Sequence, residues 1–218
     1  MRTALVFAAA PLQPTARLRA RLAEVDAPYV VAADEGAATA LAFGYQPDVV
    51  IGDLDSLSDA TRLELEFRGV TFETYPRDKD FTDGQLALER ALQIQPTAMW
   101  LLGFLGGPRL DQSVANILLL RHINVQTVLM DGMNECVLLG PHTEFGWNPA
   151  QKEIVSLIPL EGDVEGVTTR GLRWSLKDEV LLFGETRGLS NEPISDDVSV
   201  SIGSGHVLLT RHFPITEP

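Results

Sequence analysis

This sequence has almost no cysteine and no long apolar run, and each absence excludes a class of protein. Its 218 residues include a single cysteine, Cys136, so the chain cannot form an internal disulfide. A reducing compartment, the cytoplasm, is therefore expected. Because Cys136 lies in the apolar run NECVLLG, we interpret it as buried core. No apolar run approaches the ~20 residues of a membrane-spanning helix, so no membrane partner is expected.

The sequence also lacks any run rich in lysine and arginine. Its formal net charge is −13 and its pI about 4.6. This balance argues against nucleic acid as a partner. An acidic chain can still bind a polyanion such as ATP, provided that metal ions or local N–H groups offset the charge. Apolar residues make up 45% of the chain, which is enough for a packed core.

The first residues, MRTALVFAAAPLQP, superficially resemble a secretory signal. The apolar run is at the short limit for such a segment, and only Arg2 supplies positive charge before it. A buried first strand followed by a proline-rich turn is the better interpretation.

The region 1–133 alternates short apolar runs with amphipathic stretches. The apolar runs TALVFAA, APYVVAAD, DVVIG, AMWLLG and VQTVLMDG predict strands. Helices are expected over 15–24, 37–43, 60–67, 83–94 and 111–122. Strand–helix alternation with continuously apolar strands predicts an α/β domain with a parallel, Rossmann-like sheet.

The region 134–218 has a different texture. Its segments are short, rich in β-formers and separated by glycine, proline, asparagine and aspartate. They predict an antiparallel β-sandwich or barrel domain. The segment DVSVSIGSGHVLLTR is expected to form a hairpin around Gly203, Ser204 and Gly205.

Four polar clusters lie where open α/β sheets are expected to bind ligands. Three of them follow predicted strands of the first domain, and one leads into a predicted helix. The first is Asp34, at the end of YVVAAD. The second is GDLDS, in which Asp53 and Asp55 could together reach one hard cation such as Mg²⁺. The alternative for this pair is a turn in which an aspartate hydrogen-bonds its own backbone.

The third cluster is RDKDFTDGQLAL, residues 77–88. Thr82 followed by Gln85 forms a capping-box pattern, so Thr82 is expected to begin a helix with Asp83 in its first turn. The cap explains Asp83 but not Asp78 and Asp80, which precede it.

The fourth cluster is GFLGGPRLDQ, residues 103–112. Gly103, Gly106 and Gly107 would let backbone N–H groups approach a phosphate, and Arg109 adds a planar donor fork. The segment is not a Walker A loop, because no G-K-[ST] follows the glycines. A plain tight turn is the alternative.

Taken in order, these clusters resemble the thiamine pyrophosphokinase (thiamine diphosphokinase) family. The resemblance covers nearly the whole chain and rests on AADEGA (32–37), PDVVIGDLDS (47–56), DKDFTDGQLAL (78–88), GFLGGPRLDQSVANI (103–117), GLRWSL (171–176) and RGLSNE (187–192). Three residues depart from the family pattern. Pro108 looks like an insertion, Gln112 stands where histidine is expected, and Glu35 replaces a glycine.

The resemblance implies Mg²⁺-dependent transfer of a diphosphoryl group from ATP to the hydroxyl of thiamine, which releases AMP. The implied metal ligands are Asp53, Asp55, Asp80 and Asp83. These four and Arg109 form the implied catalytic set, with either Asp80 or Asp55 accepting the hydroxyl proton. The residues implied to contact the nucleotide are Lys79, Thr82, Gly103, Gly106, Gly107, Arg109 and Asp111.

The same resemblance implies thiamine contacts from Asp34, Trp174, Ser190 and Asn191, and a homodimer. Alternatively, Trp174 is core, and RGLSN is a plain turn. Two other functions are open: a thiamine or nucleotide sensor that has lost turnover, and a metal-dependent nucleotide-sugar transferase.

Overall fold

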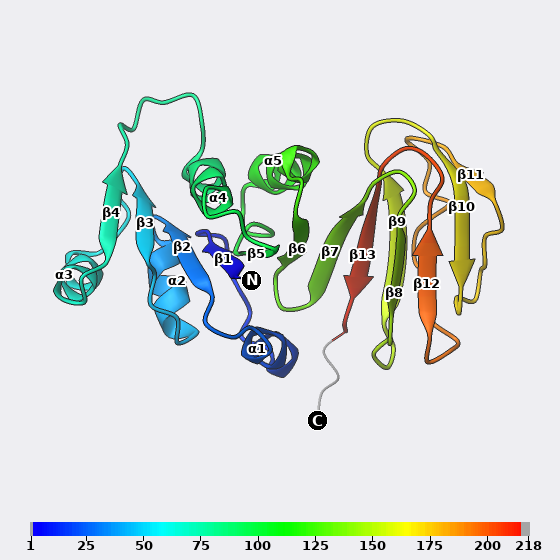
Figure 1. The fold of residues 1–218 in the computed structure, drawn as a ribbon, viewed down its shortest axis with the longest axis horizontal. Helices are drawn as coiled ribbons and strands as arrows, with labels where there is room; N and C mark the ends of the chain where they lie inside the picture. The colour runs from blue at the N-terminus through cyan, green and yellow to red at the C-terminus, as the bar shows by residue number, and fades with distance from the viewer. Residues whose placement is uncertain (1, 215–218) are drawn as a thin grey trace. The chain divides into compact units, whose positions relative to one another are not determined.

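The computed structural model describes residues 2–214, which divide between Gly132 and Met133 into two compact units (Figure 1). Among the described residues, no helix combines the length and apolar character needed to cross a membrane.

The first unit is built on six parallel strands. In chain order they are β1 (Thr3–Phe7), β2 (Tyr29–Ala33), β3 (Val49–Gly52), β4 (Thr71–Thr74), β5 (Ala98–Leu102) and β6 (Gln126–Met130). They lie side by side in the order β4-β3-β2-β1-β5-β6. Leu5, Ile51 and Leu101 are fully buried, as continuously apolar strands covered on both faces require. The short strand β4 was not predicted.

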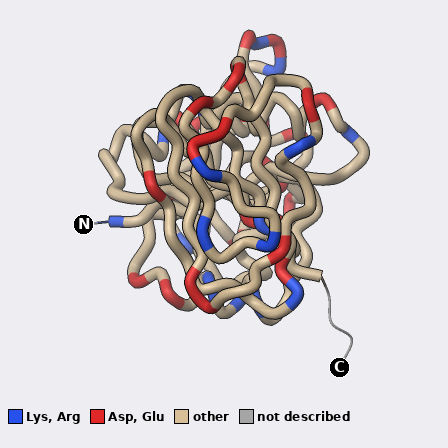
Figure 2. The backbone as a smooth tube through the Cα atoms, turned by 90° about the vertical axis from the view of Figure 1, so that its right-hand side faces the viewer, with Lys and Arg blue, Asp and Glu red and all other residues tan. Residues whose placement is uncertain are grey.

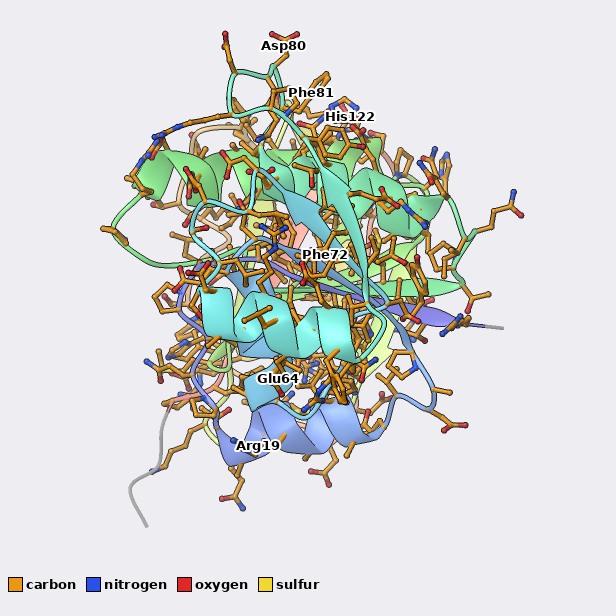
Figure 3. All side chains as sticks on the ribbon, turned by 90° about the vertical axis from the view of Figure 1, so that its left-hand side faces the viewer. Arg19, Glu64, Phe72, Asp80, Phe81 and His122 are labelled. Carbon is orange, nitrogen blue, oxygen red and sulfur yellow. The ribbon has the colours of Figure 1, made fainter. Side chains whose placement is uncertain are left out.

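The helices of this unit are α1 (Ala16–Ala23), α2 (Gly36–Ala42), α3 (Asp59–Phe67), α4 (Asp83–Leu92), α5 (Leu110–Leu119) and the 3₁₀ turn η1 (Leu120–His122). Figures 1 and 3 show α4 and α5 on one side of the strands and α1, α2 and α3 on the other. Side-chain caps begin three helices: Thr15, Ser58 and Thr82 each accept a hydrogen bond from the N–H three residues on. The predicted parallel α/β domain is confirmed.

The strand order reverses beside β1. Strands β2, β3 and β4 are added on one side of β1, and β5 and β6 on the other. At such a switch point, connections leave neighbouring strands in opposite directions and open a crevice at their carboxyl ends. The carboxyl ends of β1, β2, β3 and β5 therefore define where a ligand site is expected.

The second unit consists of two antiparallel sheets, ordered β7-β13-β9 and β11-β10-β12-β8. The strands are β7 (Asn134–Leu139), β8 (Glu144–Trp147), β9 (Ile154–Pro159), β10 (Val164–Arg170), β11 (Glu179–Leu181), β12 (Val198–Ser201) and β13 (Val207–His212). Buried and partly exposed residues alternate along β12, as expected for a sheet with one covered face. The antiparallel β fold predicted for this region is confirmed.

The predicted hairpin around Gly203–Gly205 is wrong. Strand β12 pairs with β10 and β8, whereas β13 pairs with β7 and β9, so the glycine-rich link carries the chain from one sheet to the other. Its backbone is held by the strand it crosses, because the N–H of Gly203 donates to the carbonyl of Glu165 at 2.9 Å. Gly205 has a φ of +84°, and a Cβ there would lie 2.7 Å from the carbonyl oxygen of Asp163.

Candidate active site

The carboxylate of Asp34 joins the ends of β2 and β3. Asp34 has a φ of +44°, and its Oδ1 accepts a hydrogen bond from the N–H of Leu54 at 3.0 Å. The carboxylate packs against Gly52, where a Cβ would lie 2.0 Å from Oδ1. The absence of a side chain at Gly52 therefore leaves the space in which this carboxylate reaches the backbone of Leu54.

Asp34 is also electrostatically strained. Burial, followed by the nearby carboxylates of Asp83 and Asp53, raises the pKa of Asp34 to about 6, against the opposing effect of the hydrogen bond from Leu54. Carboxylates from three separate motifs therefore lie close enough to repel one another at this edge of the sheet. The resemblance implies a substrate contact for Asp34, and nothing in the sequence predicts this coupling to Asp83.

Asp53 and Asp55, the D-x-D pair, form the local turn that is the alternative to a metal site. The N–H of Asp55 donates to Oδ1 of Asp53 at 3.2 Å, and this bond lowers the pKa of Asp53, with smaller contributions from Lys79 and Arg77. Asp55 is exposed, and its Oδ2 lies 3.7 Å from a guanidinium nitrogen of Arg77. The turn uses one carboxylate oxygen of Asp53, so it does not exclude a cation at the other.

Helix α4 begins at this edge and presents Asp83. Thr82 caps the helix as predicted, because its hydroxyl accepts from the N–H of Gln85 at 3.2 Å. The reciprocal half of the capping box is wrong: the Gln85 side chain donates instead to Glu89, at 2.9 Å. That (i, i+4) partner lies on the same face of the helix and is within easier reach.

Lys79 and Asp83 form a sheltered ion pair. Nζ of Lys79 lies 3.1 Å from Oδ1 of Asp83, and the two side chains are only 13% and 23% exposed. This Oδ1 is inaccessible to solvent and has no hydrogen bond, so the contact is an ion pair alone. The structure thus brings together Lys79, Asp83, Asp53 and Asp34.

Asp78 and Asp80 do not join this group. Both are exposed, and Figure 3 shows Asp80 at the outer end of the loop between β4 and α4, with its carboxylate pointing away from the strands. Figure 2 shows acidic and basic residues following one another along the loop at the top of the view. The metal role predicted for Asp80 stays a prediction.

The glycine loop after β5 approaches the end of β1 closely. Gly103 has a φ of +72°, and a Cβ there would lie 2.3 Å from the carbonyl oxygen of Ala8. Ala8 and Ala10 donate backbone hydrogen bonds to Leu102 and Gly103, at 2.8 and 2.9 Å. The segment after β1 is therefore part of this edge. Its sequence predicts only a turn, although a run of small residues after a buried strand is a signal for close approach of the backbone.

The rest of that loop is shaped by helix α5. Gly106 and Gly107 are exposed, with φ of +79° and +76°, and the N–H of Gly106 donates to the Ser113 hydroxyl at 3.1 Å. Arg109 forms a bidentate pair with Asp111, at 2.9 and 2.5 Å, and this pairing lowers the pKa of the Asp111 carboxyl. Both side chains are exposed, so the planar fork of Arg109 is accessible but already has a carboxylate partner.

In the second unit, the two predicted thiamine motifs meet. The N–H of Trp174 donates to the side-chain oxygen of Asn191 at 3.1 Å, and the Asn191 amide donates back to the carbonyl of Trp174 at 2.7 Å. Ser190 has a φ of +60°, and its N–H donates to the Ser156 hydroxyl at 3.0 Å. Trp174 is 57% exposed, so the alternative that it fills the core is wrong.

The donor set for a metal is only partly assembled. Among the described residues, no three histidine, cysteine, aspartate or glutamate side chains form a ready metal cluster. Hard carboxylate oxygens are nevertheless present at the edge, including the solvent-inaccessible Oδ1 of Asp83. This set fits Mg²⁺, which commonly takes one or two protein carboxylates and completes its shell with water and phosphate oxygens.

A parallel sheet with carboxylates and a glycine loop at the carboxyl ends of its strands defines the class of α/β proteins that bind phosphorylated ligands. Comparison with known proteins narrows this class. The family model "Thiamin pyrophosphokinase, catalytic domain" matches residues 21–130, and "Thiamin pyrophosphokinase, vitamin B1 binding domain" matches residues 144–207. The chain belongs to the thiamin pyrophosphokinase family.

Individual relatives agree with this assignment. The chain is 30% identical over 184 residues to thiamine pyrophosphokinase of Bacillus subtilis, covering 83% of this chain and 86% of the relative. It is 29% identical over 177 residues to thiamine pyrophosphokinase 1 of rice, Oryza sativa subsp. japonica, and there covers 76% of this chain but only 65% of the relative.

Solved structures from the same family share the fold. The crystal structure of thiamine pyrophosphokinase from Bacillus subtilis superposes with a TM-score of 0.87 at 27% identity, covering 98% of this chain and all of that one. That of thiamin pyrophosphokinase from Geobacillus thermodenitrificans gives a TM-score of 0.83 at 26% identity, with 99% of each chain covered. The correspondence includes both compact units.

Proposed function

We propose that this protein transfers the diphosphoryl group of ATP to the hydroxyl of thiamine. The oxygen of the hydroxyl forms a bond to the β-phosphorus, the bond from that phosphorus to the bridging oxygen of AMP breaks, and the hydroxyl proton passes to a base. The observation that carries the proposal is the meeting of Asp34, Asp53 and Asp83, from three family motifs, at one edge of the sheet. The family membership of both units supports it.

The two regions would divide the work. Residues 1–133 would bind the nucleotide and hold the reacting atoms, and residues 134–218 would bind thiamine. The match of the first region to a catalytic-domain model and of the second to a vitamin B1-binding model supports this division.

Mg²⁺ would be held by Asp53, Asp55 and Asp83, with Asp80 as a further ligand once its loop moves inward. Bound there, the ion would offset the negative charge on the phosphoryl oxygens. The shielded oxygen of Asp83 and the turn that fixes Asp53 support the assignment of these two residues. Asp55 and Asp80 are both exposed and are the two candidates for the base that accepts the hydroxyl proton.

The phosphates would lie against the glycine loop and the basic side chains of Lys79 and Arg109. Gly103, Gly106, Gly107 and the cap at Thr82 would face the nucleotide, and the N–H of Gly106 would exchange its Ser113 partner for a phosphate oxygen. Arg109 would exchange its carboxylate partner, Asp111, for phosphate oxygens, which suit the same planar fork. The exposure of that pair makes the exchange feasible.

Thiamine would be recognised by the Trp174–Asn191 pair and Ser190. The exposed indole offers a face to a cationic ring, and the reciprocal hydrogen bonds with Asn191 fix the backbone beside it. We also expect a homodimer and a cytoplasmic location. Light scattering after gel filtration tests the first, and fractionation of cells tests the second.

The activity is tested by incubating the purified chain with ATP, Mg²⁺ and thiamine. AMP and thiamine diphosphate should accumulate in equal amounts. Tight thiamine binding without AMP would instead identify a sensor that has lost turnover. A nucleotide-sugar transferase is not favoured, because neither family model describes one.

A further inference from the structure

Lys79 lies where an external cation would be attracted. It is the only lysine in the first unit, and its ammonium contacts the solvent-inaccessible oxygen of Asp83 at 3.1 Å. Its side chain is 13% exposed, which is unusual for lysine because a buried ammonium loses hydration. Lys79 also stabilises the charged form of Asp53, so its charge is felt by both carboxylates.

Two cations cannot use the same carboxylates at no cost. Like charges a few ångströms apart in a partly shielded site repel strongly enough to change an affinity by an order of magnitude. The neighbouring basic residue, Arg77, also favours the charged form of Asp53, but it is far less shielded. Its side chain is 85% exposed and reaches Asp55 only at 3.7 Å, so water and salt screen it.

We propose that the ammonium of Lys79 is a built-in counter-cation, which balances Asp53 and Asp83 in the free protein and is displaced when a divalent cation binds there. The inference rests on the proposed function for the position of the metal. Displacement releases the ammonium from Asp83 and makes it available to the phosphates of ATP. Metal binding thereby frees the ammonium of Lys79 to contact the nucleotide.

Removal of the ammonium should strengthen metal binding in the absence of nucleotide. Mn²⁺ serves as the probe, because free and bound Mn²⁺ are distinguished by electron paramagnetic resonance. Lys79→Met should bind Mn²⁺ about tenfold more tightly than the unaltered protein. Lys79→Arg keeps the charge and should stay weak, and the matched control Arg77→Met should change the affinity by less than about twofold. An unchanged or weaker affinity in Lys79→Met would overturn the proposal.

A second experiment uses the unaltered protein and does not depend on the folding of a variant. The chain has three lysines, and Lys152 and Lys177 are both exposed. Acetylation by a water-soluble reagent, read by peptide mass spectrometry, should be slow at Lys79 in EDTA and severalfold faster with Mn²⁺. The rates at Lys152 and Lys177 should not change. Equal rates at Lys79 with and without Mn²⁺ would contradict displacement.

Failure of this inference can be told apart from failure of the proposed function. If the protein makes thiamine diphosphate with Mg²⁺ while Lys79 neither weakens Mn²⁺ binding nor becomes exposed, only the counter-cation role is overturned. If the protein neither binds Mn²⁺ nor produces AMP, both are overturned.

Discussion

Oδ1 of Asp34 accepts the N–H of Leu54 at 3.0 Å, so a side chain, and not only the strand ladder, joins the ends of β2 and β3. The contact requires a glycine at position 52, where a Cβ would lie 2.0 Å from that oxygen. Three features of the sequence that look independent are thus parts of one local structure: an aspartate after one strand, a glycine at the end of the next strand, and a leucine after that glycine.

Gly52→Ala should therefore be costly. The clash with Asp34, added to a φ of +151°, is expected to lower the free energy of unfolding by about 2–4 kcal/mol. Gly44→Ala is the matched control, since Gly44 also has a positive φ, +86°, but has open space around it. It should cost about 1 kcal/mol. Urea unfolding of both variants measures the difference, and equal losses would mean that Asp34 does not depend on Gly52.

Asp34 should also make stability depend on pH. Its pKa is about 6 in the folded protein against an ordinary 3.8, so between these values the folded state binds more protons. Stability should fall as the pH rises through this window and stay reduced above it. This difference between the folded and ordinary pKa corresponds to about 3 kcal/mol. Screening of this partly exposed carboxyl reduces the expected loss of stability to about 1 kcal/mol.

Asp34→Asn tests this dependence. The amide oxygen can still accept from Leu54, while the charge is removed. In EDTA, the variant should be about 1 kcal/mol more stable than the unaltered protein near neutral pH and no more stable near pH 4. Urea unfolding across this range checks both points. A variant less stable at neutral pH would show that the charge of Asp34 is favourable in the folded state.

Much of the fold follows from local features of the sequence. Continuously apolar runs such as AMWLL can be satisfied only by burial on both faces, which specifies a parallel sheet with helices around it. The caps Thr15, Ser58 and Thr82 fix the helix starts chemically. Strand β4 could not be predicted, because TFET is short and lies at the sheet edge, partly exposed. The hairpin failed because a Gly-Ser-Gly link fits a tight turn and a crossing between sheets equally well.

The candidate site also has some features that the sequence predicts and others that it does not. Acids at strand ends, Asp34 and Asp53 among them, are readable as motifs because topology brings carboxyl ends together. Side-chain pairing is not readable. The resemblance gives Lys79 a contact with the nucleotide, yet in the structure its ammonium pairs with Asp83 at (i, i+4) spacing, and Asp80 lies outside this pair. The Gln85 side chain likewise donates a hydrogen bond to Glu89 and does not pair with the backbone partner that the capping box predicts.

Asp53→Asn should nearly abolish turnover and leave the fold intact. The amide keeps the turn acceptor for the N–H of Asp55 but removes the charge proposed to hold Mg²⁺. We expect kcat to fall by on the order of a hundredfold or more, as when one electrostatic group is lost from a phosphoryl-transfer site. Asp26→Asn is the control, because Asp26 is exposed and precedes β2. Full activity in Asp53→Asn would remove this residue from the metal site.

Trp174→Ala should weaken thiamine binding selectively. Loss of the exposed indole is expected to raise KM for thiamine by about tenfold, with KM for ATP nearly unchanged. Phe183→Ala is the control, since both side chains are 57% exposed in the second unit. Steady-state kinetics with each substrate varied separately gives the answer. Equal effects of the two variants on KM for thiamine would argue against a specific role for Trp174.

The second unit contains a buried charge network whose disruption should separate stability from chemistry. Arg211 donates two hydrogen bonds to Glu153, at 2.7 and 3.0 Å, and one to Glu135 at 3.3 Å. The Arg211 and Glu153 side chains are 8% and 0% exposed, and Trp147 donates to the same Glu153 at 2.9 Å. Arg211 therefore pairs with both acids in a site with little access to water.

Arg211→Met should leave the fully buried carboxylate of Glu153 without the guanidinium that it pairs with, and cost about 3–5 kcal/mol. Arg173→Met is the matched control: Arg173 also pairs with a glutamate, Glu192 at 3.0 Å, but is 57% exposed. That pair should contribute no more than about 1 kcal/mol. Thermal and urea unfolding, followed by tryptophan fluorescence, distinguishes the two. A small loss in Arg211→Met would mean that burial of the acids costs as much as the cation restores, so that the network contributes little net stability.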